Sequence, residues 1–416
     1  MRTVAVVVVW LLLAAPVAAA TWPTIGSIRL QGNVVTRAGV IERELTLAPG
    51  NLANPEEIER NRQAVMDLGL FRDVTARTEP TPSGAVVLIL QMREKRFLLP
   101  LPHVGTNSDK DVSYGAQLRW ANVGGRNHRL NLTVQQGRFP NDERRERERE
   151  VELSYFAPHL GGSDWGASAR TEVLERVTPI AGGNFEETFH RFEALALHDL
   201  TSGRPRRGWR LGGGVLLEDQ RAKGVLAPPS DGQATALVGV ASFDDLRFHG
   251  ASETGRHFNA RLQGAAGGWG SDYSYSLWRA NYFQSRAWGK HDHQTWHLLG
   301  LLENRSGGPG TRNEFDLGGS GRLRGYESDF LQGNRLYYGA LEVAKPLWRD
   351  WLRGVVLLEL GGVDGDRAGQ RTGSLYPSIG LGVRMRLIWF VDLEIELGIA
   401  YPLRGDGGAR FFAGGN

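Results

Sequence analysis

Few stretches of this sequence bring together residue types that could do chemistry. Gly318-Gly319-Ser320-Gly321 places a serine among glycines, but Arg322 stands where the nucleophile pattern G-x-S-x-G requires its last glycine. The run His291-Asp292-His293 with His297 could ligate a metal, yet it falls in a polar turn between two expected strands, where solvated histidines are the simpler interpretation. No glycine-rich loop has phosphate-binding spacing. The sequence therefore predicts no catalytic residue, metal site or cofactor, and the protein is not expected to be an enzyme.

A second group of side chains with a possible functional role is charged and regularly spaced. In 381–387, Leu, Val, Met and Leu alternate with Gly, Arg and Arg, and in 391–399 Val, Leu and Ile alternate with Asp, Glu and Gly. Successive side chains of a strand point to opposite faces, so each segment offers one apolar and one charged face. If the strands are neighbours, basic residues lie beside acidic ones across the ladder. The charge pairs predicted from this pattern are formed by Arg384, Arg386, Glu394 and Glu396, which would face the lumen if these strands belong to a barrel.

The composition of the 416 residues excludes several classes of protein. Without a cysteine, neither a disulfide scaffold nor a thiolate metal site can form. The 49 Lys and Arg residues barely exceed the 46 Asp and Glu residues, so the chain lacks the basic surplus of a nucleic-acid binder. A hydrophobic content of 41% is too high for a disordered chain. No nucleic acid is therefore expected among the partners.

The first twenty residues have the pattern of an export signal. Arg2 precedes an apolar stretch from Val4 to Ala15, and small residues lead to a cleavage site after Ala20. The alternative, an uncleaved anchor helix, is disfavoured because the apolar run is shorter than the ~20 residues that span a bilayer. We therefore expect residues 1–20 to be a signal peptide.

From Phe97 onward the sequence alternates in short segments separated by Gly, Asp, Asn and Pro, and no apolar run of helical-span length follows Ala20. The charged alternate face favours a water-filled lumen over the core of a soluble sandwich, so residues 97–416 are predicted to form an antiparallel transmembrane β-barrel. Sixteen strands are expected, an even number, as in single-chain bacterial barrels. They are placed at 98–106, 112–122, 127–136, 149–157, 165–175, 187–198, 208–218, 234–243, 255–266, 273–286, 293–303, 335–345, 353–361, 376–387, 389–400 and 408–413.

The predicted connections alternate in length. The longer ones, 137–148, 219–233 and 304–334, fall on one end of the barrel, which is the outer end if the N-terminal domain is periplasmic. The connection 304–334 is then the sixth outer loop. Two turns on the other end, 199–207 and 244–254, are longer than this rule explains.

Residues 24–95 have the pattern of a small mixed domain. Apolar residues and turn signals predict the order strand, helix, helix, strand, strand. Asn54-Pro55-Glu56-Glu57 is a strong helix start, because Asn caps free amides and Pro suits the first helical position. Thr36 is the expected cap of the first helix, and Gly69 is expected to end the second.

Two sets of motifs resemble a known family. The string I-G-S-I-R-L-Q-G-N-V-V-T (25–36), with L-G-L-F-R-D-V (68–74) and a final strand ending in M-R-E, resembles a polypeptide-transport-associated (POTRA) domain. In the sixth outer loop, G-G-S-G-R-L-R-G-Y (318–326) resembles the R-G-Y/F motif of the BamA/TamA outer-membrane assembly factors and of two-partner-secretion translocators. The resemblance implies that the loop folds into the lumen, where Arg324, beside Gly325 and Tyr326, meets an acidic residue of strand thirteen. The matching residue is Glu359, in L-L-E-L-G where the family has F-x-D-x-G.

The resemblance implies a factor that inserts or translocates other proteins in the outer membrane of a Gram-negative bacterium. The single POTRA domain, fewer than in the named families, would face the periplasm, and an edge of its sheet would receive an unfolded client strand by β-augmentation. The expected partners are unfolded outer-membrane or secreted clients, the lipid bilayer and periplasmic accessory proteins. The alternative function is a passive solute channel or a structural surface barrel, which would not depend on the POTRA domain.

Overall fold

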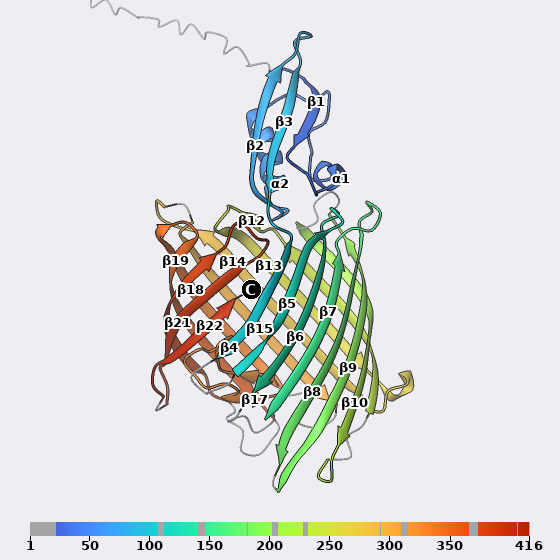
Figure 1. Cartoon of the computed structure of the whole chain (residues 1–416), viewed down its shortest axis with the longest axis vertical. Coiled ribbons are helices and arrows are strands. Elements are labelled where there is room, and N and C mark those ends of the chain that lie inside the picture. Colours follow the sequence, from blue (N-terminus) through green and yellow to red (C-terminus); the bar gives the residue numbers. More distant parts are fainter. Residues whose placement is uncertain are drawn as a thin grey trace, which may run out of the picture.

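In the computed structural model, a small domain stands on one open end of a barrel (Figure 1). The structure describes residues 22–106, 112–139, 146–180, 182–201, 207–227, 232–291, 293–308, 315–365, 373–405 and 407–415. The predicted signal peptide, residues 1–20, lies outside the described residues. Among the helices of the described ranges, none is long and apolar enough to cross a membrane.

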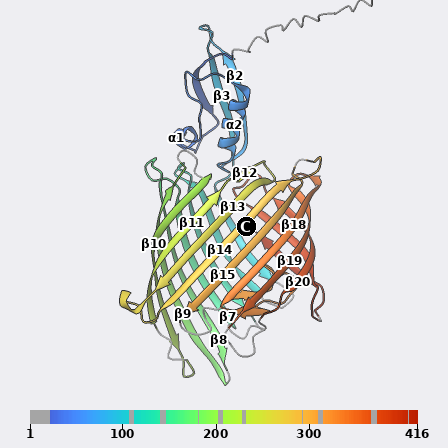
Figure 2. The same cartoon turned by 180° about the vertical axis from the view of Figure 1, so that it is seen from behind.

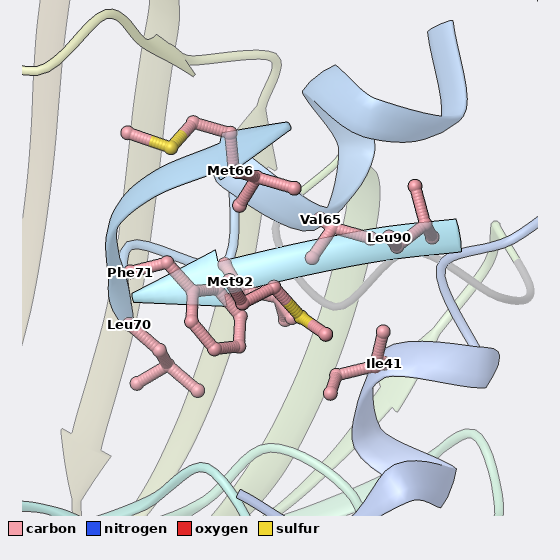
Figure 3. Packing of buried hydrophobic residues seen from close by; sticks show 9 residues of the cluster. Ile41, Val65, Met66, Leu70, Phe71, Leu90 and Met92 are labelled. Atoms are coloured by element: carbon pink, nitrogen blue, oxygen red, sulfur yellow. The ribbon is translucent and has the colours of Figure 1, made fainter. Parts of the chain in front are cut away.

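The N-terminal domain contains β1 (Ile25–Gln31), α1 (Ala38–Glu42), α2 (Pro55–Met66), β2 (Phe71–Pro80) and β3 (Val86–Glu94). This is the order of elements that the sequence predicts. β3 is the central strand, parallel to β1 and antiparallel to β2, so β1 and β2 are the two edges of the sheet. The helices lie on one side of this sheet and bury an apolar core against it, which includes Ile41 and Val65 from the helices and Phe71, Leu90 and Met92 from the strands (Figure 3).

Local sequence explains where α2 begins. The side chain of Asn54 accepts a hydrogen bond of 3.0 Å from the amide of Glu56, and Pro55 occupies the first helical position, as predicted. The prediction for α1 was wrong, because its N-cap is Arg37 and makes no side-chain cap. Thr36 instead accepts a hydrogen bond of 2.9 Å from the side chain of Asn122 in the barrel, so this residue serves the junction between the domains rather than the helix.

The predicted mainly-β fold with a transmembrane-type barrel is confirmed. In the described residues, sixteen strands of six or more residues follow one another round a closed antiparallel barrel, and the two-residue β12 (Arg247–Phe248) pairs beside β13 (Figures 1 and 2). The sixteen are β4 (Leu98–Thr106), β5 (Val112–Val123), β6 (His128–Arg138), β7 (Arg147–Ala157), β8 (Trp165–Ile180), β9 (Gly183–Asp199), β10 (Gly208–Lys223), β11 (Gly232–Asp244), β13 (Glu253–Ala265), β14 (Tyr275–Ala287), β15 (Thr295–Gly307), β18 (Arg335–Arg349), β19 (Leu352–Asp364), β20 (Tyr376–Arg386), β21 (Glu394–Pro402) and β22 (Arg410–Gly415).

Most of the connection expected at 176–186 is instead strand, while residue 181 lies outside the described residues. β8 and β9 continue to Ile180 and Gly183, which pair with each other, and their hairpin extends beyond the other strands at the end away from the N-terminal domain (Figure 1). The prediction ended these strands where the apolar alternation ends. The ladder nevertheless continues, because charged side chains pair across strands there, as Arg176 does with Glu148 at 3.1 Å.

The strand predicted at 389–400 begins later, at Glu394. Residues 387–393 form a tight turn in which the Leu387 amide donates to the Leu393 carbonyl at 2.9 Å and Asp392 has a φ of +48°. The linker from the N-terminal domain packs on this turn, since the Arg96 amide donates to the Trp389 carbonyl at 2.9 Å. Leu393, expected on the apolar outer face of a strand, is therefore buried in the turn.

Two turns of unexpected length, 199–207 and 244–254, both contact the N-terminal domain. Asp67, at the end of α2, pairs with Arg207 before β10 and accepts a hydrogen bond of 3.0 Å from the amide of Phe248 in β12. Gln63 of α2 also donates to the Phe248 carbonyl at 3.0 Å. Their extra length thus supplies the surface on which α2 docks.

Candidate functional site: an ion cluster under the inserted loop

The long connection between β15 and β18 folds back into the barrel from the end opposite the N-terminal domain. Within it, β16 (Phe315–Leu317) and β17 (Leu331–Gly333) form an antiparallel hairpin, while 309–314 lie outside the described residues. Leu317, Leu323 and Leu331 are buried, together with apolar residues of β15, β18 and β19. This apolar packing holds the loop against the inner wall.

The conformation of the motif depends on unusual backbone angles. Gly318 and Gly319 have φ values of +133° and +90°, which favour glycine, and Leu323 is held at +54° although it has a side chain. A non-glycine residue in this region costs about 1–3 kcal/mol and persists where the surroundings impose it. Here the Leu323 side chain is fully buried and its carbonyl accepts from the Tyr326 amide at 3.0 Å. The turn therefore presents Arg324 to the lumen in one orientation.

Arg324 contacts carboxylates from three strands. Its backbone amide donates to Glu359 Oε2 of β19 at 2.7 Å. Its guanidinium donates to Glu396 Oε1 of β21 at 3.1 Å and to Glu342 Oε1 of β18 at 3.2 Å, and lies 5.1 Å from the centre of the Phe412 ring on β22. The planar fork of a guanidinium suits several carboxylates at once. Arg324 thus joins the loop to the last strands of the barrel.

Glu359 lies at the centre of this arrangement. Its side chain is fully buried and accepts hydrogen bonds from the hydroxyls of Tyr338, at 2.7 Å, and Ser378, at 2.9 Å, in addition to the Arg324 amide. The Arg324 guanidinium lies farther away, with Nε 3.7 Å from Glu359 Oε1. A buried carboxylate is costly unless it is paired and hydrogen-bonded, and these donors contact both of its oxygens.

Of the four predicted lumen residues, which lie on β20 and β21, Glu396 contacts Arg324 directly. Arg384 and Glu396 are paired in register, as are Arg386 and Glu394. Arg384 Nε donates to Glu396 at 2.7 Å, and its Nη2 donates to Glu342 at 2.6 Å, so the same two carboxylates serve Arg324 and Arg384. Arg386 bonds instead to Glu253 of β13, at 2.6 Å, across the lumen from its ladder neighbour. The sequence thus places these charges on the correct face but not with all their partners.

Sequence reasoning missed several members of this ion cluster. They share an inward position on strands whose other face is apolar, so isolated charges within those strands were the available signal. They are Glu253, His297, Glu342 and Arg353. With them, the ion cluster contains five carboxylates (Glu253, Glu342, Glu359, Glu394 and Glu396) and four guanidiniums (Arg324, Arg353, Arg384 and Arg386).

Tyr326 provides a second set of contacts between the loop and the barrel wall. Its hydroxyl lies 2.8 Å from the Pro377 carbonyl and 3.1 Å from the Arg404 carbonyl. Its ring contacts Phe330 and Tyr376, with centroids 4.6 and 5.7 Å away. This aromatic group fixes the loop to β20 and to the turn after β21, on the side of the motif opposite Arg324.

Gly325 lies where the loop backbone approaches the wall most closely. A Cβ atom there would lie 2.8 Å from the Pro402 nitrogen, the Tyr401 carbonyl carbon and Ser378 Cβ, so it would have to displace the backbone. We expect Gly325→Ala to lower the free energy of unfolding by about 1–3 kcal/mol, as overpacking does. The measurement is the temperature at which the folded barrel loses its characteristic gel mobility.

Gly321→Ala is the matched control for that change. A Cβ at Gly321 meets nothing within 4 Å, and its φ is not positive. Equal melting temperatures for the two variants would show that the loop is not held tightly at Gly325.

The histidines do not gather into a metal site. His293 bonds to Ser252 at 2.8 Å in the turn, while His297 lies inside the barrel on β15, 3.2 Å from Arg384 Nη1, and Asp292 lies outside the described residues. Across the described ranges, no group of three or more His, Asp or Glu side chains could hold a metal ion. The chemistry that the ion cluster supports is electrostatic anchoring of the inserted loop through Arg324.

The fold and the ion cluster define a class: a sixteen-stranded barrel with an inserted loop and one N-terminal domain. Residues 23–95 match the family model for POTRA, described as surface antigen variable number repeat. No curated protein gave a significant match to the sequence.

Solved structures show the same architecture. The chain is similar to BamA from Haemophilus ducreyi lacking POTRA domains 1–3, with 14% identity over 95% of this chain and 84% of that chain and a TM-score of 0.57. It is also similar to CdiB from Acinetobacter baumannii (14% identity, 94% and 73% covered, TM-score 0.61) and to CdiB from Escherichia coli (13% identity, 95% and 77% covered, TM-score 0.64). The predicted resemblance to the BamA/TamA family and the related two-partner-secretion translocators is thus confirmed at the level of the fold.

Proposed function

We propose that this protein inserts or translocates other polypeptides in the outer membrane of a Gram-negative bacterium, and that it is not an enzyme. The observation that carries the proposal is the inserted loop, held in the lumen by Arg324 while a POTRA domain stands at the opposite end of the barrel. An open solute pore needs neither feature. A loop fixed by ion pairs to the last strands can instead keep the barrel closed until a client arrives.

The POTRA domain would receive the client at a sheet edge. The outer edge of β1 is occupied at its start, where the Ile25 amide donates to the Asn51 carbonyl at 2.8 Å. β2 has ten residues, and most of those after Val74 are exposed. An extended client can add to such an edge through backbone hydrogen bonds with little dependence on its sequence. We therefore place the client strand beside β2.

The rival function, a passive channel or structural barrel, predicts different behaviour without the POTRA domain. We would deplete the protein and compare outer-membrane and secreted proteins by mass spectrometry, then complement with the full chain or with a chain lacking residues 24–95. An assembly or translocation factor loses clients in the depleted cells and is not rescued by the shortened chain. Normal client levels, with a steady conductance that does not require the POTRA domain, would favour the channel.

The proposed orientation also makes a topology prediction. β19 ends at Asp364 and β20 begins at Tyr376, at the end away from the POTRA domain, and residues 366–372 between them lie outside the described ones. An epitope inserted within 365–369 is expected to react with antibody on intact cells. One inserted within 54–57, at the start of α2, is expected to react only after the outer membrane is broken. The reverse labelling would overturn the orientation.

A further inference from the structure

A cavity at the junction of the two domains is separate from the ion cluster. It has a volume of about 790 Å³ and lies between α1 and the turns that join β5 to β6 and β7 to β8. Figure 1 shows α1 directly above this part of the barrel rim. Hydrogen bonds to backbone carbonyls join both walls, since the Arg37 amide donates to the Gly125 carbonyl at 2.9 Å and the Arg43 side chain donates from Nη1 to the Gly162 carbonyl at 2.6 Å. The cavity is therefore a built feature of the docked domains.

The lining of this junction cavity is basic. Arg37, Arg43 and Arg126 line it, and Glu42 is the one carboxylate among the residues found to line it. Arg43 also pairs with Asp164 at 2.6 Å, but its Nε is buried and has no hydrogen-bond partner within the described part of the chain. A buried donor of this kind is costly unless a ligand or water accepts from it.

Two histidines complete the polar wall. Burial lowers the pKa of His159, which favours its uncharged ring. Its neighbour His128 hydrogen-bonds through Nδ1 to the Tyr155 hydroxyl, at 2.6 Å. The positive charge of the cavity therefore comes from guanidinium groups, whose planar forks suit phosphate oxygens.

The position of the cavity indicates which phosphate it meets. Tyr155 follows Val151 and Leu153 on the exposed outer face of β7, and Trp165, at the start of β8, is also exposed there. Aromatic rings at the ends of barrel strands mark the level of lipid headgroups. Leu160, which lines the cavity, is 45% exposed, so an apolar side chain at the surface borders the basic pocket.

We propose that the junction cavity binds the phosphate headgroup of an anionic phospholipid, whose acyl chains lie along the outer face of β7 beside Tyr155 and Leu153. This inference goes beyond the proposed function and rests only on the membrane location that accompanies it. A basic pocket joined to an apolar outer surface matches a charged headgroup with chains attached. An acidic client segment would match the arginines but not the apolar surface. Lipid held here would fix the POTRA domain to the barrel at the membrane surface.

The test is lipid binding by the purified full chain. The protein in mild detergent is titrated with phosphatidylglycerol or with phosphatidylethanolamine, and bound lipid is counted by native mass spectrometry. Loss of charge-assisted contacts in the Arg37→Gln, Arg126→Gln double variant is expected to weaken phosphatidylglycerol binding by about tenfold. The matched control is Arg349→Gln, because Arg349 is exposed on the same end of the barrel but does not line this cavity.

The outcomes separate this proposal from the proposed function, because no client takes part. Tighter binding of phosphatidylglycerol than of phosphatidylethanolamine, lost in the double variant and kept in the control, would support it. Equal phosphatidylglycerol binding by wild type and double variant would overturn it. Displacement by equimolar inorganic phosphate or by an acidic peptide would also overturn the assignment to lipid. Gel mobility reports folding, and Arg126→Gln alone, at an exposed side chain, is the substitute if the double variant does not fold.

Discussion

Arg324→Ala is expected to cause a large loss of both stability and activity. Removing this guanidinium leaves the five carboxylates of the ion cluster with three arginines, and Glu342 and Glu396 each lose one partner. Breaking a buried ion pair from one side costs about 3–5 kcal/mol, whereas an exposed pair is worth under about 1 kcal/mol. Glu342 is 3% exposed, so the larger value applies. The measurements are the unfolding temperature of the folded barrel and the level of client proteins in complemented cells.

Arg322→Ala is the control for this prediction. Arg322 lies two residues away in the same loop, and its side chain is exposed. Its replacement is expected to leave both readouts near wild type. Arg324→Lys should be intermediate, because an ammonium keeps the charge but lacks the fork that reaches two carboxylates. Comparable losses for the two alanine variants would refute a special role for Arg324.

A disulfide across the closing seam is expected to abolish insertion of clients into the membrane. The seam joins β22 to β4, and β22 has only six residues, whereas β18 and β19 pair over thirteen residue pairs. In β4, Pro100 and Pro102 cannot donate hydrogen bonds to the ladder. The seam should therefore hold fewer hydrogen bonds than other strand pairs and open first. Locking it would stop lateral release.

The choice of cysteine positions depends on which face each residue occupies. Val104 of β4 and Phe412 of β22 flank the seam, but these residues face opposite sides of the barrel wall. Val104 is 76% exposed on the outer face, while Phe412 is buried and its ring fills the space that a side chain at Gly398 would need. The neighbouring Phe411 is exposed on the outer face. Phe411→Cys should therefore be combined in turn with Pro102→Cys and Val104→Cys, and the pair that crosslinks used.

The outcome is decided by comparing oxidised and reduced protein. Because the native chain has no cysteine, one defined crosslink forms, and reduction should restore activity. The control joins Leu341 to Leu358, which are paired on β18 and β19 and exposed on the outer face, so this disulfide leaves the seam free. Full activity with a completely crosslinked seam would exclude lateral opening and favour conduction through the lumen.

The sequence by itself determined the features that depend on local order. Side-chain alternation repeats every two residues, so the number of barrel strands and most of their positions could be predicted without knowing their neighbours. The start of α2 followed from Asn54 and Pro55, since a cap acts on amides within one turn. Alternation also placed Arg384 and Glu396 on the polar face, and their pairing followed because they lie on adjacent strands.

The tertiary structure decided what depends on closing the barrel and seating the loop. Glu342 and Glu396 are 54 residues apart, yet both bond to Arg324, because closure brings β18 and β21 to the same side of the lumen as the loop. Seating the loop depends on a strained Leu323 and on the space left by Gly325, which no local pattern reveals. The long turns near Arg207 and Phe248 likewise have a role only once α2 docks on them. Such contacts join residues distant in the chain, so their geometry is set by packing of the whole molecule and not by the properties of neighbouring residues.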